Sequence, residues 1–375
     1  MAKIAKRSLE TLRVGIIGTG SWTQRAHIPA FLRCQNATVV GICGHDLQRT
    51  KEVAKKFNVP FACSDYKELL TREDVDAIDI TTSTNRHFQV ALDAVEAGKP
   101  VLCEKPLATS YKEGRILEQR ARAKGVPTKM GFTFRYSPVI QRMKELVDTG
   151  FIGDPFHLNG FEQNSQFINP DTPFRWTPNP KSDPIMPGSL EEYGAHLIDL
   201  GLWLMGDLSS VVGQMRNTIP QRLIRDYGKV MPINIEDGCV WLGQFKNGAL
   251  ATFQTSFITV GGYPGIEIRL YGSKGALIGR LVEEFGVTET LLAATPEKVE
   301  FKPQPIPDRL YPKGYERDES WIEVQFGNLI QHFVDEILHE KEPEGGFVDG
   351  VKSEEVATAV YESHLTKRWV DLPLE

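Results

Sequence analysis

Two charged side chains stand at the end of an apolar segment in the stretch Gly98 to Leu107. Val101 to Cys103 is predicted to be a short buried strand, and Glu104 and Lys105 follow it directly. Open α/β sheets bind ligands at the carboxyl ends of their strands, so this position suits a catalytic lysine. Pro106 lacks an amide donor and disfavours helix at Lys105, which fixes the lysine in an extended or turn conformation. A solvated Glu-Lys pair in a loop is the alternative interpretation.

A second group of polar side chains falls at helical spacing between residues 188 and 206. At about 100° per residue one stripe of the predicted helix is polar, whereas leucines occupy another stripe. The polar stripe holds Glu192, His196, Asp199 and Trp203. Histidine has an ordinary pKa of about 6.5, which suits proton transfer near neutral pH. The Glu192-to-His196 spacing also fits a simple i,i+4 pair, and without a longer motif we predict no metal site.

A glycine-rich turn follows the first predicted strand, which begins at Arg13. A strand, the pattern G-x-G-x-x-G and a helix form the fingerprint for dinucleotides, in which the helix N-terminus faces the pyrophosphate. Thr23 takes the place of the third glycine, so we expect looser packing of the helix on the strand. A tight turn without a ligand is the alternative. The residues expected to contact the cofactor here are Gly18, Thr19, Gly20, Ser21 and Trp22.

The end of the second predicted strand, Thr38 to Cys43, should carry an acid for the ribose of NAD. Gly44 stands in that place and is followed by His45 and Asp46. A glycine leaves room for a 2′-phosphate that Arg49 could reach, whereas Asp46 would repel it. The sequence therefore slightly favours NAD, leaves NADP open, and places His45 and Arg49 at the cofactor.

Small polar residues end a further predicted strand, Val75 to Ile80, and can approach a nicotinamide and its ribose closely. We expect Thr82, Asn85 and His87 to bind the cofactor, together with Glu104 and Lys105.

The order of the predicted elements indicates two domains and an α/β fold class. Strands and helices alternate through residue 132, which predicts a dinucleotide-binding Rossmann domain, a doubly wound parallel sheet, over residues 12–132. From residue 133 longer strands are joined by hairpin turns such as Lys246-Asn247-Gly248. We therefore predict an α+β domain for substrate binding and oligomerisation over residues 133–375, with a large, mostly antiparallel open sheet. The long loop over residues 164–187 suits a cover for a site.

The composition limits the classes of function. The chain has 375 residues, of which 41% are hydrophobic and 25% charged, as in globular proteins. A net charge of −6 gives no basic footprint for nucleic acid. No apolar run approaches a membrane span and no signal peptide is evident, so we expect a cytoplasmic protein. The five scattered cysteines predict buried reduced thiols.

Four motifs in order resemble the glucose-fructose oxidoreductase and inositol dehydrogenase family, often written Gfo/Idh/MocA. They are Gly18 to Thr23, Glu104 to Pro106, Arg135 to Pro138, and Glu192 to Asp199. The chain departs from the family pattern at two positions. Glu192 stands where the family usually has aspartate, and Ser83 where a proline usually follows the strand.

This resemblance implies an NAD(P)-dependent oxidoreductase that transfers hydride between a secondary hydroxyl of a sugar, glycoside or cyclitol ring and nicotinamide. Oxidation of a glycoside at its 3-hydroxyl is the favoured form. Lys105 and His196 would flank that hydroxyl and Glu192 would orient His196, with either the histidine or the lysine as the base. The side chains expected to bind the substrate are Arg135, Tyr136, Trp176, Tyr193 and His196. A homodimer or homotetramer is also implied.

Two other functions stay open. A redox-assisted glycosidase would retain its NAD and show no net turnover of added cofactor. A regulator that senses a sugar or nucleotide would not need Lys105 and His196. Both residues are present, which favours catalysis.

Overall fold

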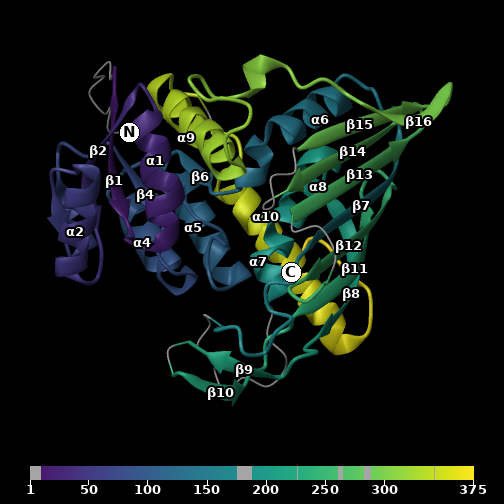
Figure 1. Cartoon of the computed structure of the whole chain (residues 1–375), viewed down its shortest axis with the longest axis horizontal. Coiled ribbons are helices and arrows are strands. Elements are labelled where there is room, and N and C mark those ends of the chain that lie inside the picture. Colours follow the sequence, from purple (N-terminus) through teal and green to yellow (C-terminus); the bar gives the residue numbers. More distant parts are fainter. Residues whose placement is uncertain (1–9, 175–187, 226, 261–264, 283–288, 342) are drawn as a thin grey trace. The chain divides into compact units, whose positions relative to one another are not determined.

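The computed structural model describes residues 10–174, 188–225, 227–260, 265–282, 289–341 and 343–375. The chain divides into two compact units, Met1–Ser137 with Tyr311–Val351, and Pro138–Leu310 with Lys352–Glu375 (Figure 1). The first unit thus takes in a late segment that the predicted boundaries place in the second domain. The reason is helix α9 (Trp321–Leu338), which packs against helix α1 (Ile28–Arg33).

The first unit contains a six-stranded sheet in the order β3-β2-β1-β4-β5-β6, and all its pairs are parallel. Its strands are β1 (Leu12–Ile17), β2 (Ala37–Cys43), β3 (Ala62–Cys63), β4 (Ala77–Ile80), β5 (Val101–Cys103) and β6 (Thr128–Met130). The strand order reverses between β1 and β4, and such a switch point is where open α/β sheets bind ligands. The predicted doubly wound parallel sheet is confirmed.

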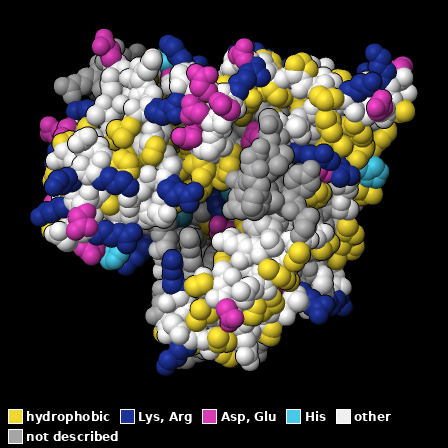
Figure 2. Space-filling view, in the orientation of Figure 1, with side chains coloured by type: hydrophobic (Ala, Val, Ile, Leu, Met, Phe, Trp, Pro, Cys, Tyr) yellow, Lys and Arg dark blue, Asp and Glu magenta, His cyan; other side chains and the backbone are white. Residues whose placement is uncertain are grey.

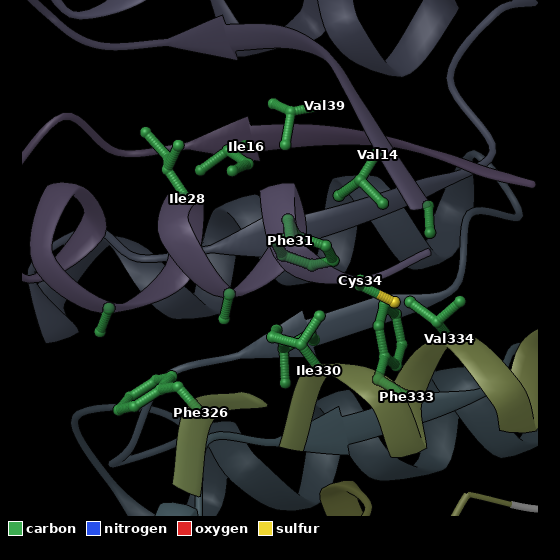
Figure 3. Close-up of a cluster of buried hydrophobic side chains, with 14 of the residues drawn as sticks. Val14, Ile16, Ile28, Phe31, Cys34, Val39, Phe326, Ile330, Phe333 and Val334 are labelled. Atoms are coloured by element: carbon green, nitrogen blue, oxygen red, sulfur yellow. The ribbon is translucent and has the colours of Figure 1, made fainter. Parts of the chain in front are cut away.

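Two hydrophobic clusters cover the two faces of this sheet. One joins it to α1, α9 and α2 (Leu47–Phe57), and the other to α3 (Tyr66–Thr71), α4 (Thr84–Glu96) and α5 (Tyr111–Lys124). Figure 3 shows Phe31 of α1 in one cluster with Ile330 and Phe333 of α9. All three side chains are fully buried. Since burial contributes about 25 cal/mol per Å² of apolar surface, this contact attaches α9 to the first unit.

The second unit contains a nine-stranded sheet in the order β16-β15-β14-β13-β7-β12-β11-β8-β17. Among the described strands of this sheet only β7 and β12 pair in parallel, so the predicted large, mostly antiparallel sheet is confirmed. The strands are β7 (Pro155–Gln163), β8 (Leu208–Arg216), β11 (Gly238–Phe245), β12 (Leu250–Ser256), β13 (Gly265–Gly272), β14 (Ala276–Val282), β15 (Thr290–Thr295), β16 (Lys298–Pro303) and β17 (Val370–Asp371). A separate small sheet pairs β9 (Gln221–Ile224) with β10 (Lys229–Pro232).

The large sheet buries one face and leaves the other open. On β11 and β12 the residues alternate, and the rings of Trp241 and Phe253 stack 5.0 Å apart on the buried face. Val240 and Leu242 point the other way and are 51% and 44% exposed. Figure 2 shows hydrophobic side chains at the surface over this sheet.

The remaining helices are α6 (Pro138–Asp148), α7 (Ser189–Glu192), α8 (Gly194–Met205) and α10 (Phe347–Thr366). Across the described ranges no helix has the length and apolar character needed to cross a membrane. All five cysteines are free and buried, as predicted.

Candidate active site

A cavity of about 550 Å³ lies in the first unit at the carboxyl ends of β1, β2 and β4. Many of the predicted cofactor residues line it, namely Gly18, Thr19, Gly20, His45, Arg49, Thr82 and Asn85. Among the lining residues that the sequence analysis missed are Ser64, Tyr66 and Arg86. Arg86 stands in the first turn of α4, directly after the polar strand end that the analysis had noted.

The two glycines of the turn serve different purposes. Gly18 has φ +139°, and a Cβ there would lie 2.2 Å from Thr81 Oγ1 and 2.7 Å from the Thr81 carbonyl oxygen. The fold therefore requires glycine at this position. A Cβ on Gly20 would come no closer than 3.9 Å, to Thr23 Oγ1, so the protein itself leaves that space open. An open glycine on a cavity wall fits the close approach of a pyrophosphate.

Thr23 ties the first helical segment to the end of β4. It begins η1 (Thr23–His27), a π-helical turn that leads into α1. Its side chain is fully buried, and Thr23 Oγ1 lies 2.7 Å from Thr81 Oγ1. The predicted loosening at this position is therefore wrong, because a hydrogen bond replaces the close contact of a glycine. Single π-helical turns are frequent at functional sites.

Gly44 is required by packing. A Cβ on Gly44 would lie 2.7 Å from side-chain atoms of both Thr19 and Thr50. The nearby acid, Asp46, caps α2 by accepting a hydrogen bond from the Arg49 amide at 3.1 Å. The Arg49 guanidinium donates to the Thr19 carbonyl at 3.4 Å.

The polar lining of this cavity fits a dinucleotide. Thr82 Oγ1 is buried and has no hydrogen-bond partner among the described residues. Buried polar atoms are normally satisfied, so this hydroxyl is suited to a ligand group. Arg49 and Arg86 add positive charge for a pyrophosphate. With the space left open at Gly20, the residues present fit NAD.

Glu104 and Lys105 follow β5, as predicted. Neither is among the lining residues of the cavity, and the same holds for Ser21, Trp22 and His87. Glu104 is buried, and its Oε2 accepts a hydrogen bond from the Lys105 amide at 3.1 Å. The Lys105-Pro106 peptide bond is cis.

His27 and Asp79 form a buried network with Glu104. His27 Nε2 lies 2.9 Å from Glu104 Oε1, and His27 Nδ1 lies 2.9 Å from Asp79 Oδ2. The Trp22 indole N–H also donates to Glu104 Oε1, at 3.3 Å. The sequence analysis missed both His27 and Asp79. Their only signal is a histidine within the first helical segment and one acid inside the apolar strand β4.

The network sets the charges of its members. Burial opposes the charge on His27, but Asp79 and Glu104 outweigh burial and raise its pKa to about 10. Burial acts to raise the pKa of Glu104 too, but the hydrogen bond and the charge of His27 hold that pKa below its ordinary value. For Asp79 burial prevails over His27, and its pKa is raised. His27 is therefore an imidazolium at neutral pH.

His87 supports the loops next to the cavity. It is 1% exposed, and its Nδ1 lies 2.7 Å from the Pro106 carbonyl oxygen. Its Nε2 lies 3.1 Å from the Thr82 carbonyl oxygen. Burial lowers the pKa of His87, so the ring is neutral at physiological pH.

Arg135 and Tyr136 lie in the interior of the first unit, in η2 (Thr133–Tyr136). They are 3% and 2% exposed. The Arg135 guanidinium pairs with Asp349 at 2.8 Å, and the Tyr136 hydroxyl donates to the Glu344 carbonyl at 3.3 Å. Both side chains thus have structural partners.

The predicted helix around His196 is divided in two. Helix α7 ends at Glu192, Tyr193 follows, and α8 begins at Gly194. His196 and Asp199 are 8% and 1% exposed, and α8 is buried on nearly all sides. The expected division into one polar face and one packing face is therefore wrong.

A buried carboxylate holds the start of α7. Glu236 Oε1 accepts from the amides of Gly188, at 2.9 Å, and Leu190, at 2.5 Å, and its Oε2 accepts from the Ser189 hydroxyl at 2.8 Å. A Cβ on Gly188 would lie 2.4 Å from the Glu236 carbonyl oxygen, so glycine is required. Burial raises the pKa of Glu236 to about 7.

The aromatic side chains of the predicted loop act in packing where they are described. Phe167 and Phe174 meet edge to face with their centroids 4.8 Å apart. Tyr193 packs edge to face on Phe257 at 4.9 Å, and its hydroxyl accepts a hydrogen bond from the Asn164 amide. Trp176 lies outside the described residues. Within the described ranges no group of three or more His, Cys, Asp or Glu side chains could hold a metal ion.

Comparison with known protein families identifies the family of this chain. The family model described as "Oxidoreductase family, NAD-binding Rossmann fold" matches residues 12–132. Its companion, "Oxidoreductase family, C-terminal alpha/beta domain", matches residues 144–372. The chain belongs to the Gfo/Idh/MocA oxidoreductase family. Its first unit is accordingly an NAD-binding Rossmann unit.

Individual relatives of the family are distant. Levoglucosan dehydrogenase from Pseudarthrobacter phenanthrenivorans is 24% identical over 72% of this chain and 74% of its own length. Glucose-6-phosphate 3-dehydrogenase from Bacillus subtilis is 27% identical over 70% of this chain and 72% of its own length. A solved structure of levoglucosan dehydrogenase in complex with NADH and L-sorbose has a TM-score of 0.84 at 22% identity, covering 97% of this chain and 100% of that one. The likeness to this solved structure shows the fold of the chain.

Proposed function

We propose that this oxidoreductase is an NAD-dependent dehydrogenase that oxidises a secondary hydroxyl on a sugar, glycoside or cyclitol ring. The observation that carries the proposal is the cavity at the β1, β2 and β4 ends, with its open Gly20 and the buried hydroxyl of Thr82. Glu104 and Lys105 end the strand next to β4 in the same sheet. The names of two relatives, levoglucosan dehydrogenase and glucose-6-phosphate 3-dehydrogenase, support a sugar substrate.

The proposed chemistry requires a proton to leave the hydroxyl as hydride leaves the carbon. NAD⁺ supplies the hydride acceptor when bound. We infer that His196 takes the proton, that the Lys105 ammonium stabilises the developing alkoxide, and that Glu192 orients His196. Lys105 as the base is the alternative, because a lysine next to a positive charge can lose its proton near neutral pH.

The finer features of the substrate rest on resemblance. Oxidation at the 3-hydroxyl of a glycoside is our preferred form, and a relative named for 3-dehydrogenation supports it. Substrate contacts by Arg135, Tyr136, Trp176 and Tyr193 stay predictions.

Cofactor choice and assembly complete the proposal. Asp46, fixed as the cap of α2, would repel a 2′-phosphate, which supports NAD over NADP. We propose a homodimer or homotetramer formed through the open face of the nine-stranded sheet. A cytoplasmic location also stays a prediction, and the five free thiols agree with it.

A substrate panel tests this function. The purified protein is mixed with inositols, aldoses and aryl glycosides, each with NAD⁺ or NADP⁺, and reduced nicotinamide is followed by absorbance beside Lys105→Ala. We expect NAD⁺ reduction with at least one ring polyol and a loss of at least about 100-fold in Lys105→Ala. Release of an aglycone without net reduction would instead indicate the redox-assisted glycosidase. No turnover of any pair, with NAD⁺ bound, would favour a sensor.

A further inference from the structure

The buried His27 network lies outside the catalytic roles assigned above. His27 is fully buried, and its two ring nitrogens contact carboxylates from two neighbouring strand ends. A buried ion pair is weak support for stability, because desolvation offsets the attraction between the charges. Such groups are better explained where they fix one specific arrangement. Here that arrangement is the turn that carries Lys105.

The contacts of Glu104 connect His27 to that turn. Glu104 Oε1 accepts from His27 and from the Trp22 indole, while Oε2 accepts from the Lys105 amide. The surrounding space is tight, since a Cβ on Gly131 would lie 3.0 Å from the Glu104 carboxyl carbon. An ionised Glu104 can accept all three hydrogen bonds, whereas a protonated one turns an acceptor into a donor. The position of Lys105 therefore depends on the charge of Glu104.

We propose that His27, as an imidazolium held between Asp79 and Glu104, is a positioning residue that keeps Glu104 ionised and thereby fixes the Lys105 turn. This inference rests on the proposed function where it concerns turnover. The part that concerns the ionisation of Glu104 stands without it.

The groups that face this pair are few. His27 faces Asp79 from β4 and Glu104 after β5, and from α9 it meets the Phe326 ring, with centroids 4.9 Å apart. The charges acting on Glu104 are those of His27, Lys105 and, when protonated, His87, which favour its ionised form, and that of Asp79, which opposes it. Burial keeps His87 neutral at physiological pH. Loss of the His27 cation therefore removes the main support for a charged Glu104. The Glu104 carboxyl should then titrate at higher pH.

The first test compares His27→Gln with the unmodified enzyme across pH. We expect the Kd for NAD⁺ to stay within about threefold, because His27 does not line the cavity. We expect kcat to fall at least about 30-fold at pH 6 and less at pH 9, since Glu104 regains its charge as pH rises. The same substitution in a Glu104→Gln background should show no such acid limb. An unchanged shape of the kcat profile in His27→Gln would overturn the proposal.

The second test needs no substrate. In ¹⁵N-labelled protein the Trp22 indole resonance, assigned with Trp22→Phe, reports the charge of Glu104 through their hydrogen bond. It should not titrate between pH 5 and 9 in the unmodified protein and should titrate in His27→Gln. Titration in both proteins, or in neither, would overturn the proposal even if no sugar is turned over. If no sugar is turned over but the resonance behaves as expected, the proposed function fails and the His27 assignment stands.

A further variant guards against misfolding. His332→Gln is the matched control, because this histidine of α9 packs its ring against Tyr136. We expect His332→Gln to match the unmodified protein in both tests.

Discussion

His27 also makes the stability of the protein depend on pH. Its pKa rises from 6.5 in the unfolded chain to about 10 in the folded protein. Below pH 6.5 both states hold the proton, so the stabilisation is fully present. As pH rises from 6.5 to about 10 only the folded state holds the proton, so the free energy of unfolding falls, by on the order of 5 kcal/mol.

This dependence can be checked by urea unfolding at a series of pH values. We expect His27→Gln to unfold more easily than the unmodified protein at pH 7. Between about pH 8 and 10 the difference should narrow, because the unmodified protein loses its protonated histidine. A difference that stays constant over that range would contradict the raised pKa of His27.

Side chains of this kind are what the sequence reveals least. Glu104 and Lys105 could be predicted because a strand ends at a charged pair and a proline, which is a local pattern. His27 and Asp79 could not, because the partner of His27 is 52 residues away along the chain and only the fold brings the two together.

At the scale of elements, a helix end can be predicted from the sequence where a capping residue sets it. Ser110 caps the start of α5 and Gly125 its end, and these are residue types that favour the two positions. The start of α7 has a distant cause, because Glu236 holds it from 46 residues away. Helix α9 joins the first unit through packing against α1, which no local pattern signals.

The glycine turn provides a matched pair of substitutions. Gly18→Ala should destabilise the protein by about 2 kcal/mol or more, because its Cβ would overlap Thr81 in a strained backbone conformation. Gly20→Ala should leave thermal unfolding unchanged and weaken NAD⁺ binding at least about tenfold. Calorimetry of unfolding and of NAD⁺ binding separates the two effects. Equal binding by Gly20→Ala and the unmodified protein would place the pyrophosphate elsewhere.

Glu236, which holds the start of α7, also makes the stability of the protein depend on pH. For His27 the charged form is favoured by its partners, whereas for Glu236 the charged form is disfavoured by burial. Its pKa rises from 4.5 to about 7, so the folded state holds a proton that the unfolded state has lost between those values. The free energy of unfolding should fall by about 3 kcal/mol as pH rises through that window, and the cost persists above it.

Chemical unfolding from pH 4.5 to 8 tests this cost of a buried charge. Glu236→Gln should flatten the pH dependence, because the amide never ionises. Glu300 is an exposed glutamate of β16, and Glu300→Gln serves as the control. This variant should keep the pH dependence of the free energy of unfolding. If the free energy of unfolding falls with pH at the same slope in Glu236→Gln and in the unmodified protein, another group is responsible for the pH dependence.

At the scale of the whole molecule, the open face of the nine-stranded sheet predicts self-association. Leu242 is 44% exposed there, beside other apolar side chains of β11. Leu242→Lys should shift a dimer or tetramer toward monomer in sedimentation equilibrium, with unchanged thermal unfolding. Leu32→Lys, at an exposed leucine of α1, should leave the association unchanged. A monomeric unmodified protein at micromolar concentration would contradict the proposed assembly.

Lys105 belongs to the first unit and His196 to the second. Family-wide motifs made both units predictable from the sequence. The substrate was not predictable, because the aromatic residues expected to select it are buried within their own units or lie outside the described residues.

Direct transfer of a ring hydrogen to the cofactor is the most direct test of the central claim. A sugar or cyclitol deuterated at its ring carbons is incubated with the protein and NAD⁺, and the nicotinamide is analysed by mass spectrometry and NMR. We expect deuterium at C4 of the nicotinamide with the unmodified protein and at least about 100-fold less with Lys105→Ala. Nicotinamide that stays free of deuterium, with every ring polyol that binds, would contradict it.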